Sequence, residues 1–166
     1  IPLCGLLLLA LGFYLFVPRV AVLTIGQSIP EWRLKDLEGN DFFFNDTRGK
    51  VLILNFWATW CTYCREELRF LNELAGEYGP QGLQVVSALK DVNNFDLARE
   101  SRDKSALTFP ILLDGRNDLF RAFGVGGLPF SALIDRTGRI RYVHLGFDAR
   151  DTGRYRAEIR ALLEEE

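Results

Sequence analysis

Two cysteines, Cys61 and Cys64, lie at the junction of two segments with different patterns. Residues 51–57 are almost wholly apolar, whereas residues 62–78 carry apolar side chains at helical spacing. The apolar segment is typical of a central strand that is covered on both faces of a sheet. The junction therefore predicts a buried strand, a helix that follows it, and two thiols in the first turn of that helix.

The position of the two thiols favours redox chemistry. A thiol at a helix N-terminus lies near unsatisfied backbone N–H groups and the positive end of the helix dipole, which favour the thiolate. The three-residue spacing brings the second sulfur round the same turn, within reach of a disulfide. We expect Cys61 to be the attacking, partly exposed thiol and Cys64 to be the resolving one.

The alternatives for this pair are half of a zinc site or two small core residues. Zinc takes about four ligands, but the chain has only one further cysteine, Cys4, and one histidine, His144. Because Cys4 lies in an apolar leader, we expect it to be a passive residue, and we expect no metal site.

The N-terminal segment is set apart by its lack of charge. Residues 1–17 carry no charged side chain, and a chain of 166 residues has room for one domain and such an appendage. A membrane-spanning helix needs roughly 20 apolar residues, and the core of a signal peptide fewer. We expect residues 1–25 to be a membrane anchor and tether, with a cleavable signal as the alternative, and residues 26–166 to form the folded domain.

Apolar periodicity and turn signals divide that domain into strands and helices. We expect strands at residues 32–37, 41–44, 51–57, 82–89, 109–114, 130–135 and 139–145. We expect helices at residues 62–78, 94–104, 118–123 and 151–165, with Asn93 or Asn94 as the cap of the second. This order predicts a mixed central sheet with helices on both faces, a three-layer α/β sandwich.

With these elements in order, the chain resembles the thioredoxin superfamily, and within it the membrane-anchored TlpA/ResA/CcmG (DsbE) group. The resemblance rests on residues 49–57, the Trp-Cys-Thr-Tyr-Cys run at 60–64, Glu67, and residues 125–138. It covers the chain from about residue 26 to the C-terminus. It implies a thioredoxin-like fold and thiol–disulfide exchange at Cys61 and Cys64.

The resemblance also implies how a substrate is held. The proline that matches Pro129 is cis in the family and faces the disulfide, and a cis bond is rare enough to imply a role. Leu128 would offer its backbone to an extended substrate segment, and Pro129 would keep the site free of a competing N–H group. Without Cys61 in the chain, a trans proline opening an edge strand would be favoured instead. Trp60, beside Cys61, is expected to shape the rim of the substrate site.

Glu67 is the candidate proton acceptor. It follows Cys64 by three residues on the same helical face, and the resolving thiol must lose its proton during exchange. A partly buried carboxylate with a raised pKa could take that proton. The alternative is that Glu67 is merely an exposed glutamate, favourably placed near the N-terminus of a helix. Glu66 fits that description better. Thioredoxin itself has a buried aspartate on the preceding strand, where this chain has Asn55.

Three positions depart from the family pattern. Tyr63 stands where the family usually has proline, which leaves the redox poise open. Arg69 stands at a second position where proline is common, so the usual kink of the helix is expected to be missing. Phe130 stands where the family often has threonine, and a bulky side chain there would narrow the substrate groove. These departures leave the reaction type unchanged and its direction open.

The resemblance implies a membrane-anchored enzyme whose domain faces the periplasm or the cell exterior. Its expected activity is the reduction of disulfides in exported proteins, apocytochrome c being the family's best-known client. A membrane electron donor would restore the dithiol, and the Cys61–Cys64 disulfide would be the sole redox group. A net charge of −2 with scattered lysines and arginines argues against a nucleic-acid partner.

Other functions stay open as alternatives. A disulfide oxidase or isomerase uses the same dithiol at another potential, which no residue encodes directly. A peroxidase of the peroxiredoxin type would need proline at Leu54 and threonine at Ala58. A copper chaperone is suggested by the affinity of thiolates for Cu(I). Such chaperones carry a Cys-x-x-x-Cys pair with a histidine partner, whereas only Thr62 and Tyr63 separate the two cysteines here.

Overall fold

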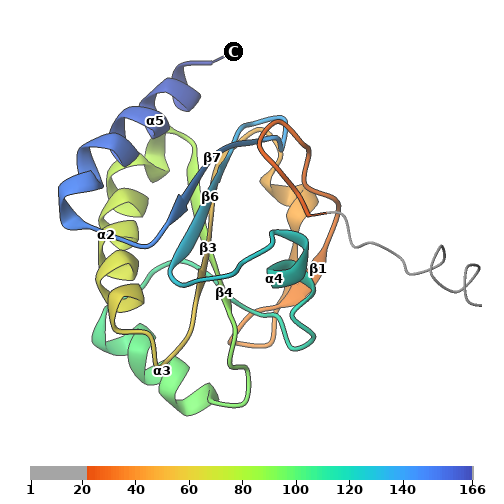
Figure 1. The fold of residues 1–166 in the computed structure, drawn as a ribbon, viewed down its shortest axis with the longest axis vertical. Helices are drawn as coiled ribbons and strands as arrows, with labels where there is room; N and C mark the ends of the chain where they lie inside the picture. The colour runs from red at the N-terminus through yellow and green to blue at the C-terminus, as the bar shows by residue number, and fades with distance from the viewer. Residues whose placement is uncertain (1–21, 166) are drawn as a thin grey trace, which may run out of the picture.

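The computed structural model describes residues 22–165 (Figure 1). Most of the predicted anchor, residues 1–25, therefore lies outside the described residues, and so does Cys4. Within residues 22–165, no helix combines the length and the apolar character that crossing a membrane requires.

A five-stranded mixed sheet forms the middle layer, in the order β5-β4-β3-β6-β7. Its strands are β3 (Val51–Trp57), β4 (Leu83–Leu89), β5 (Ile111–Leu113), β6 (Phe130–Ile134) and β7 (Ile140–Leu145). β3 lies in the centre because it pairs in parallel with β4 and antiparallel with β6. Every residue of β3 is buried, which confirms the prediction of a strand covered on both faces.

Helices cover both faces of this sheet (Figure 1). The elements on one face are α2 (Thr62–Tyr78), α3 (Phe95–Lys104) and α5 (Thr152–Glu164), and those on the other are α4 (Asp118–Ala122) and the 3-10 turn η1 (Phe44–Thr47). Side chains of β3 alternate between the two cores, so that Ile53 packs under α2 and Leu54 packs on the opposite side. The predicted three-layer sandwich is confirmed.

A two-stranded antiparallel hairpin precedes the central sheet. It consists of β1 (Arg33–Lys35) and β2 (Asp41–Phe43). The Asp36 carboxylate closes the turn between them, because it accepts hydrogen bonds from the backbone N–H groups of Glu38 and Asn40 at 3.0 and 2.8 Å. The predicted hairpin is therefore confirmed.

Two local predictions need correction. Asn94 occupies the cap position of α3, but its side chain accepts no capping bond and instead donates to Asp91 Oδ2 at 3.1 Å. The strand expected at residues 109–114 is shortened to β5, because Pro110 has no N–H group to donate to a ladder. Its carbonyl still accepts from the Ser87 N–H group at 3.0 Å.

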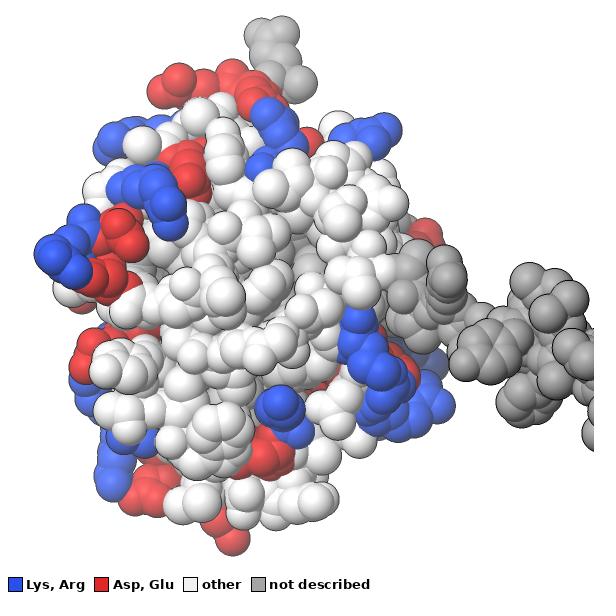
Figure 2. Space-filling view, viewed as in Figure 1, with Lys and Arg blue, Asp and Glu red and all other residues white. Residues whose placement is uncertain are grey.

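Charged side chains of both signs lie next to one another around the margin of the face in Figure 2, and uncharged residues fill its centre. Ion pairs also join elements, as where Arg156 of α5 contacts Glu77 of α2. Because the signs alternate, this face carries no extended basic stripe.

Candidate active site

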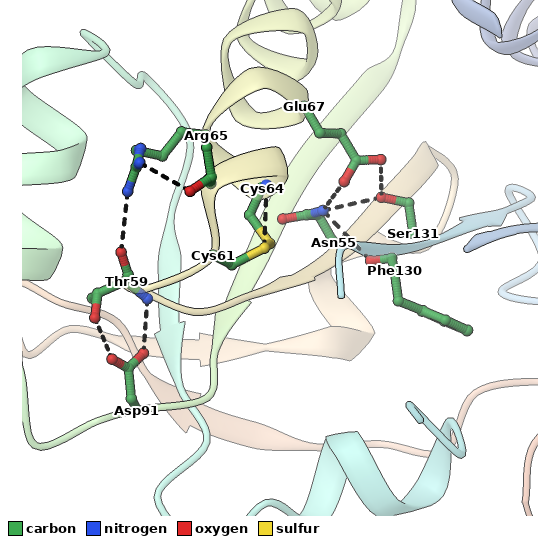
Figure 3. Close-up of a disulfide and its surroundings, with 10 residues drawn as sticks. Asn55, Thr59, Cys61, Cys64, Arg65, Glu67, Asp91, Phe130 and Ser131 are labelled. Carbon is green, nitrogen blue, oxygen red and sulfur yellow. Dashed lines mark hydrogen bonds between the residues drawn. A yellow bond between two sulfur atoms is a disulfide. The ribbon is translucent and has the colours of Figure 1, made fainter. Parts of the chain in front are cut away.

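The two cysteines form a disulfide at the start of α2 (Figure 3). Cys61 is the N-cap of the helix, and its Sγ accepts a hydrogen bond from the backbone N–H of Cys64 at 3.2 Å. This is the contact that favours a thiolate at a helix N-terminus. Cys61 is 6% exposed and Cys64 is fully buried, so Cys61 is less exposed than predicted but is the more accessible of the two.

The turn before the cysteines is held by a carboxylate that the sequence analysis did not identify. Asp91, in the loop after β4, accepts hydrogen bonds from the backbone N–H of Thr59, at 3.0 Å, and from its hydroxyl group. Arg65 of α2 donates to the Thr59 carbonyl at 3.4 Å (Figure 3). These contacts fix the path from β3 to Cys61.

Glu67 lies one turn beyond Cys64 and is fully buried. Its Oε1 atom accepts from the Tyr155 hydroxyl at 2.5 Å and from the Ser131 hydroxyl at 3.0 Å. Its Oε2 atom accepts from Asn55 Nδ2 at 2.7 Å. Burial raises the pKa of Glu67 to about 7, although its three hydrogen bonds act in the opposite direction. Glu67 is thus more deeply buried than the sequence predicted, and its pKa is shifted in the expected direction.

A row of buried polar side chains crosses the sheet beneath Glu67. It runs in register over four strands as Ser87, Asn55, Ser131 and His144. Asn55 Nδ2 also donates to Ser131 Oγ at 3.1 Å and to the Phe130 carbonyl at 3.4 Å. This row faces α2 and α5, and it supplies Glu67 with donors from the sheet.

His144, at the end of this row, contacts residues of α5. Its ring stacks on Tyr155, with ring centroids 3.9 Å apart. Its Nε2 atom lies 2.6 Å from Glu158 Oε2, and its Nδ1 atom lies 2.8 Å from Arg154 Nη2. Burial lowers the pKa of His144. The imidazole thus helps to fix the tyrosine that donates to Glu67.

The predicted cis bond is present between Leu128 and Pro129, directly before β6. Trp60 and Tyr63, on either side of Cys61, are 66% and 65% exposed, which agrees with a rim of aromatic side chains. Phe130 was expected to narrow the groove, but this prediction is wrong. Its side chain points away from the disulfide (Figure 3) and is buried against Phe56 in the opposite core.

Sequence reasoning thus found Cys61, Cys64 and Glu67, and it missed Tyr155, Ser131 and Asp91. Within residues 22–165, no cluster of three histidine, cysteine or acidic side chains is arranged to hold a metal ion.

Comparisons with known proteins agree with this geometry. Residues 25–143 match the model of the AhpC/TSA family. The chain is 36% identical over 145 residues to thiol-disulfide oxidoreductase ResA of Geobacillus thermodenitrificans, with 85% of this chain and 82% of that protein covered. It is 35% identical over 135 residues to ResA of Bacillus anthracis, with 79% and 77% covered.

A solved structure shows that the similarity extends to the three-dimensional fold. The crystal structure described as a thiol:disulfide interchange protein DsbE from Chlorobium tepidum superposes with a TM-score of 0.79 at 32% identity. The match covers 85% of this chain and 99% of that one. The predicted thioredoxin-like fold is confirmed.

Proposed function

The chain belongs to the AhpC/TSA family and is a thiol–disulfide oxidoreductase, and we propose that it reduces disulfides of exported proteins with Cys61 and Cys64. The observation that carries the proposal is a disulfide at a helix N-terminus one turn from a buried carboxylate, Glu67.

In the first step, the Cys61 thiolate attacks one sulfur of the client disulfide. A bond forms between Cys61 and that sulfur, and the second client sulfur leaves as a thiolate that takes up a proton. The backbone N–H of Cys64 points at Cys61 Sγ, which supports the thiolate, and Cys61 is the more accessible sulfur.

In the second step, Cys64 loses its proton and attacks Cys61 Sγ. The Cys61–Cys64 disulfide forms, the mixed disulfide breaks, and the client leaves with both sulfurs reduced. Glu67 accepts the Cys64 proton, because a carboxyl group with a pKa of about 7 can be either charged or protonated near neutral pH.

Client contact is assigned to the surface around the disulfide. The backbone of Leu128 would pair with an extended client segment, next to Pro129, which has no N–H group to compete. The exposed indole of Trp60 would pack against apolar client side chains.

The apolar run of residues 1–17 supports a membrane-anchored protein whose domain faces the periplasm or the cell exterior. A membrane electron donor would return two electrons to the Cys61–Cys64 disulfide, and no further cofactor is needed for the exchange. The mixed charges in Figure 2 support protein clients rather than nucleic acid. Apocytochrome c is the proposed client class, because its haem-attachment motif, Cys-x-x-Cys-His, carries two thiols that can be oxidised to a disulfide.

The test is turnover of an oxidised Cys-x-x-Cys-His peptide in a Cys4→Ala background, which removes the third thiol of the chain. Cys61→Ser should abolish turnover, and Cys64→Ser should accumulate a mixed disulfide that mass spectrometry detects. A scrambled peptide with the same disulfide measures client preference. Unimpaired turnover by Cys61→Ser would contradict the assignment.

A further inference from the structure

We propose that Asn55 is a positioning residue that binds the reduced Cys64 thiol and thereby shifts the enzyme toward its dithiol form. Asn55 is fully buried on the central strand. Its Oδ1 atom has no hydrogen-bond partner among the residues that the structure describes. That atom points toward the Cys61–Cys64 disulfide (Figure 3).

The orientation of the Asn55 amide follows from its other contacts. Nδ2 lies within 2.7 Å of Glu67 Oε2 and within 3.4 Å of the Phe130 carbonyl oxygen. A carbonyl oxygen only accepts hydrogen bonds, so the NH₂ group must face this side. Oδ1 is then left facing the disulfide, because the two ends of a planar amide point in divergent directions.

Helix geometry places Cys64 on the same side of Asn55. Cys64 and Glu67 are both fully buried and lie three residues apart on α2. Helical side chains lean toward the N-terminus of their helix, so the Glu67 carboxylate leans toward the turn that holds Cys64. The amide that binds Glu67 therefore lies beneath that turn.

The redox state decides whether Oδ1 is satisfied. In the disulfide, neither sulfur carries a hydrogen, so an acceptor faces groups that cannot donate. Reduction adds two electrons and two protons, supplied by a dithiol donor or by two glutathione thiols, and Cys64 then carries an S–H group that donates to Oδ1. A buried acceptor without a donor is destabilising, and the penalty falls on the disulfide form alone.

The consequence is a more oxidising couple than the same site would have without Asn55. Stabilising the reduced form of a dithiol raises its reduction potential. Asn55 also contacts Glu67, so one amide links the resolving thiol to its proposed proton acceptor. This inference rests on the proposed function only in that Cys61 and Cys64 cycle between disulfide and dithiol.

The test exchanges Asn55 for leucine, which has a similar size and forms no hydrogen bond. Full-length protein in the Cys4→Ala background is equilibrated with reduced and oxidised glutathione. Asn55→Leu should favour the disulfide about five- to tenfold, a shift of about 20 to 30 mV toward a more reducing potential for a two-electron couple.

Two control variants separate this effect from others. Ser131→Ala removes a donor to Glu67 but leaves Asn55 Oδ1 in place. Ser87→Ala removes the hydroxyl group at the position beside Asn55 on β4, which also lacks a partner among the described residues. Both should move the equilibrium by less than twofold. A shift in Ser131→Ala as large as that in Asn55→Leu would assign the effect to Glu67 and overturn the proposal.

A spectroscopic measurement needs no substitution of Asn55. In a reduced Cys4→Ala, Cys61→Ser protein, Cys64 carries the only thiol. Its infrared S–H stretch should lie at the lowered frequency of a hydrogen-bonded thiol and should rise in Asn55→Leu. A free S–H frequency with Asn55 present would overturn the proposal even if Asn55→Leu failed to fold. Neither readout involves a client, so loss of client turnover in Cys61→Ser remains a separate result.

Discussion

The sharpest consequence of the structure is that Glu67→Gln should stabilise the protein at neutral pH while it slows the reaction. Burial raises the pKa of Glu67 from 4.5 to about 7. Between these values the folded state keeps a proton that the unfolded state has released. Stability therefore falls as pH rises through this window, and the penalty is complete above pH 7.

The size of the effect follows from the same shift. Each tenfold change in proton affinity is worth about 1.4 kcal/mol, so the penalty reaches about 3 kcal/mol above pH 7. Glutamine has no proton to lose and forgoes at most about one hydrogen bond, worth about 1 kcal/mol. Glu67→Gln should thus be more stable than the unmodified chain by about 2 kcal/mol at pH 8 and no more stable at pH 4.

Urea unfolding of the oxidised proteins between pH 4 and pH 8, followed by tryptophan fluorescence, measures this difference. Glu66→Gln is the matched control, because Glu66 is the adjacent exposed carboxylate and its exchange should leave the pH profile unchanged. A difference between Glu67→Gln and the unmodified chain that stays constant with pH would refute the buried, proton-holding carboxylate.

The same variant tests the proton acceptor. Loss of a general base costs about 10² to 10⁴ in rate, so the mixed disulfide with a client should persist longer in Glu67→Gln by about this factor. The initial attack by Cys61 should keep its rate. Rapid mixing with an acid quench (quenched flow), followed by mass spectrometry, separates formation of the mixed disulfide from its resolution.

Three further predictions follow from contacts around the disulfide. Asp91→Ala should lower the free energy of unfolding by about 1 to 3 kcal/mol, because two donors of Thr59 lose their partner; unchanged urea midpoints would contradict this. Tyr155→Phe should raise the pKa of Glu67 above about 7, because a hydrogen bond that lowers it is lost, and the pH at which the mixed disulfide resolves fastest should rise with it. Trp60→Ala should raise KM for the client peptide several-fold and leave thermal stability within about 0.5 kcal/mol, since the indole is exposed; a large loss of stability would place the indole in the core.

The central strand and the following helix could be predicted from local patterns. An almost wholly apolar run predicted β3, a helical repeat predicted α2, and a spacing of three residues put Glu67 on the face of Cys64. The cis bond before Pro129 came from the family resemblance, since no local pattern separates a cis proline from a trans one.

The partners of Glu67 were beyond such patterns because they come from distant parts of the chain. Tyr155 lies 88 residues from Glu67 in sequence, and Ser131 lies 64 residues away. One usable signal was present: Asn55 and Ser131 are the single polar residues of β3 and β6, and Ser87 is one of two polar residues in β4. Strand register then places all three in one row, but register is a tertiary property that the sequence alone left undetermined.

Asp91 was missed, and Phe130 was placed on the wrong face, for a related reason. Asp91 belongs to a loop, and nothing in its neighbours indicates that it caps the turn at Thr59. Phe130 was assigned to the groove from its place after Pro129, but the first residue of β6 alternates to the face of the opposite core.

The reduction potential of the Cys61–Cys64 couple tests the central claim most directly. A reductase of exported proteins should have a potential near that of thioredoxin, about −270 mV, in equilibrium with a glutathione or dithiothreitol buffer. A value near about −120 mV, typical of a strong disulfide oxidant, would contradict the proposed direction of electron flow.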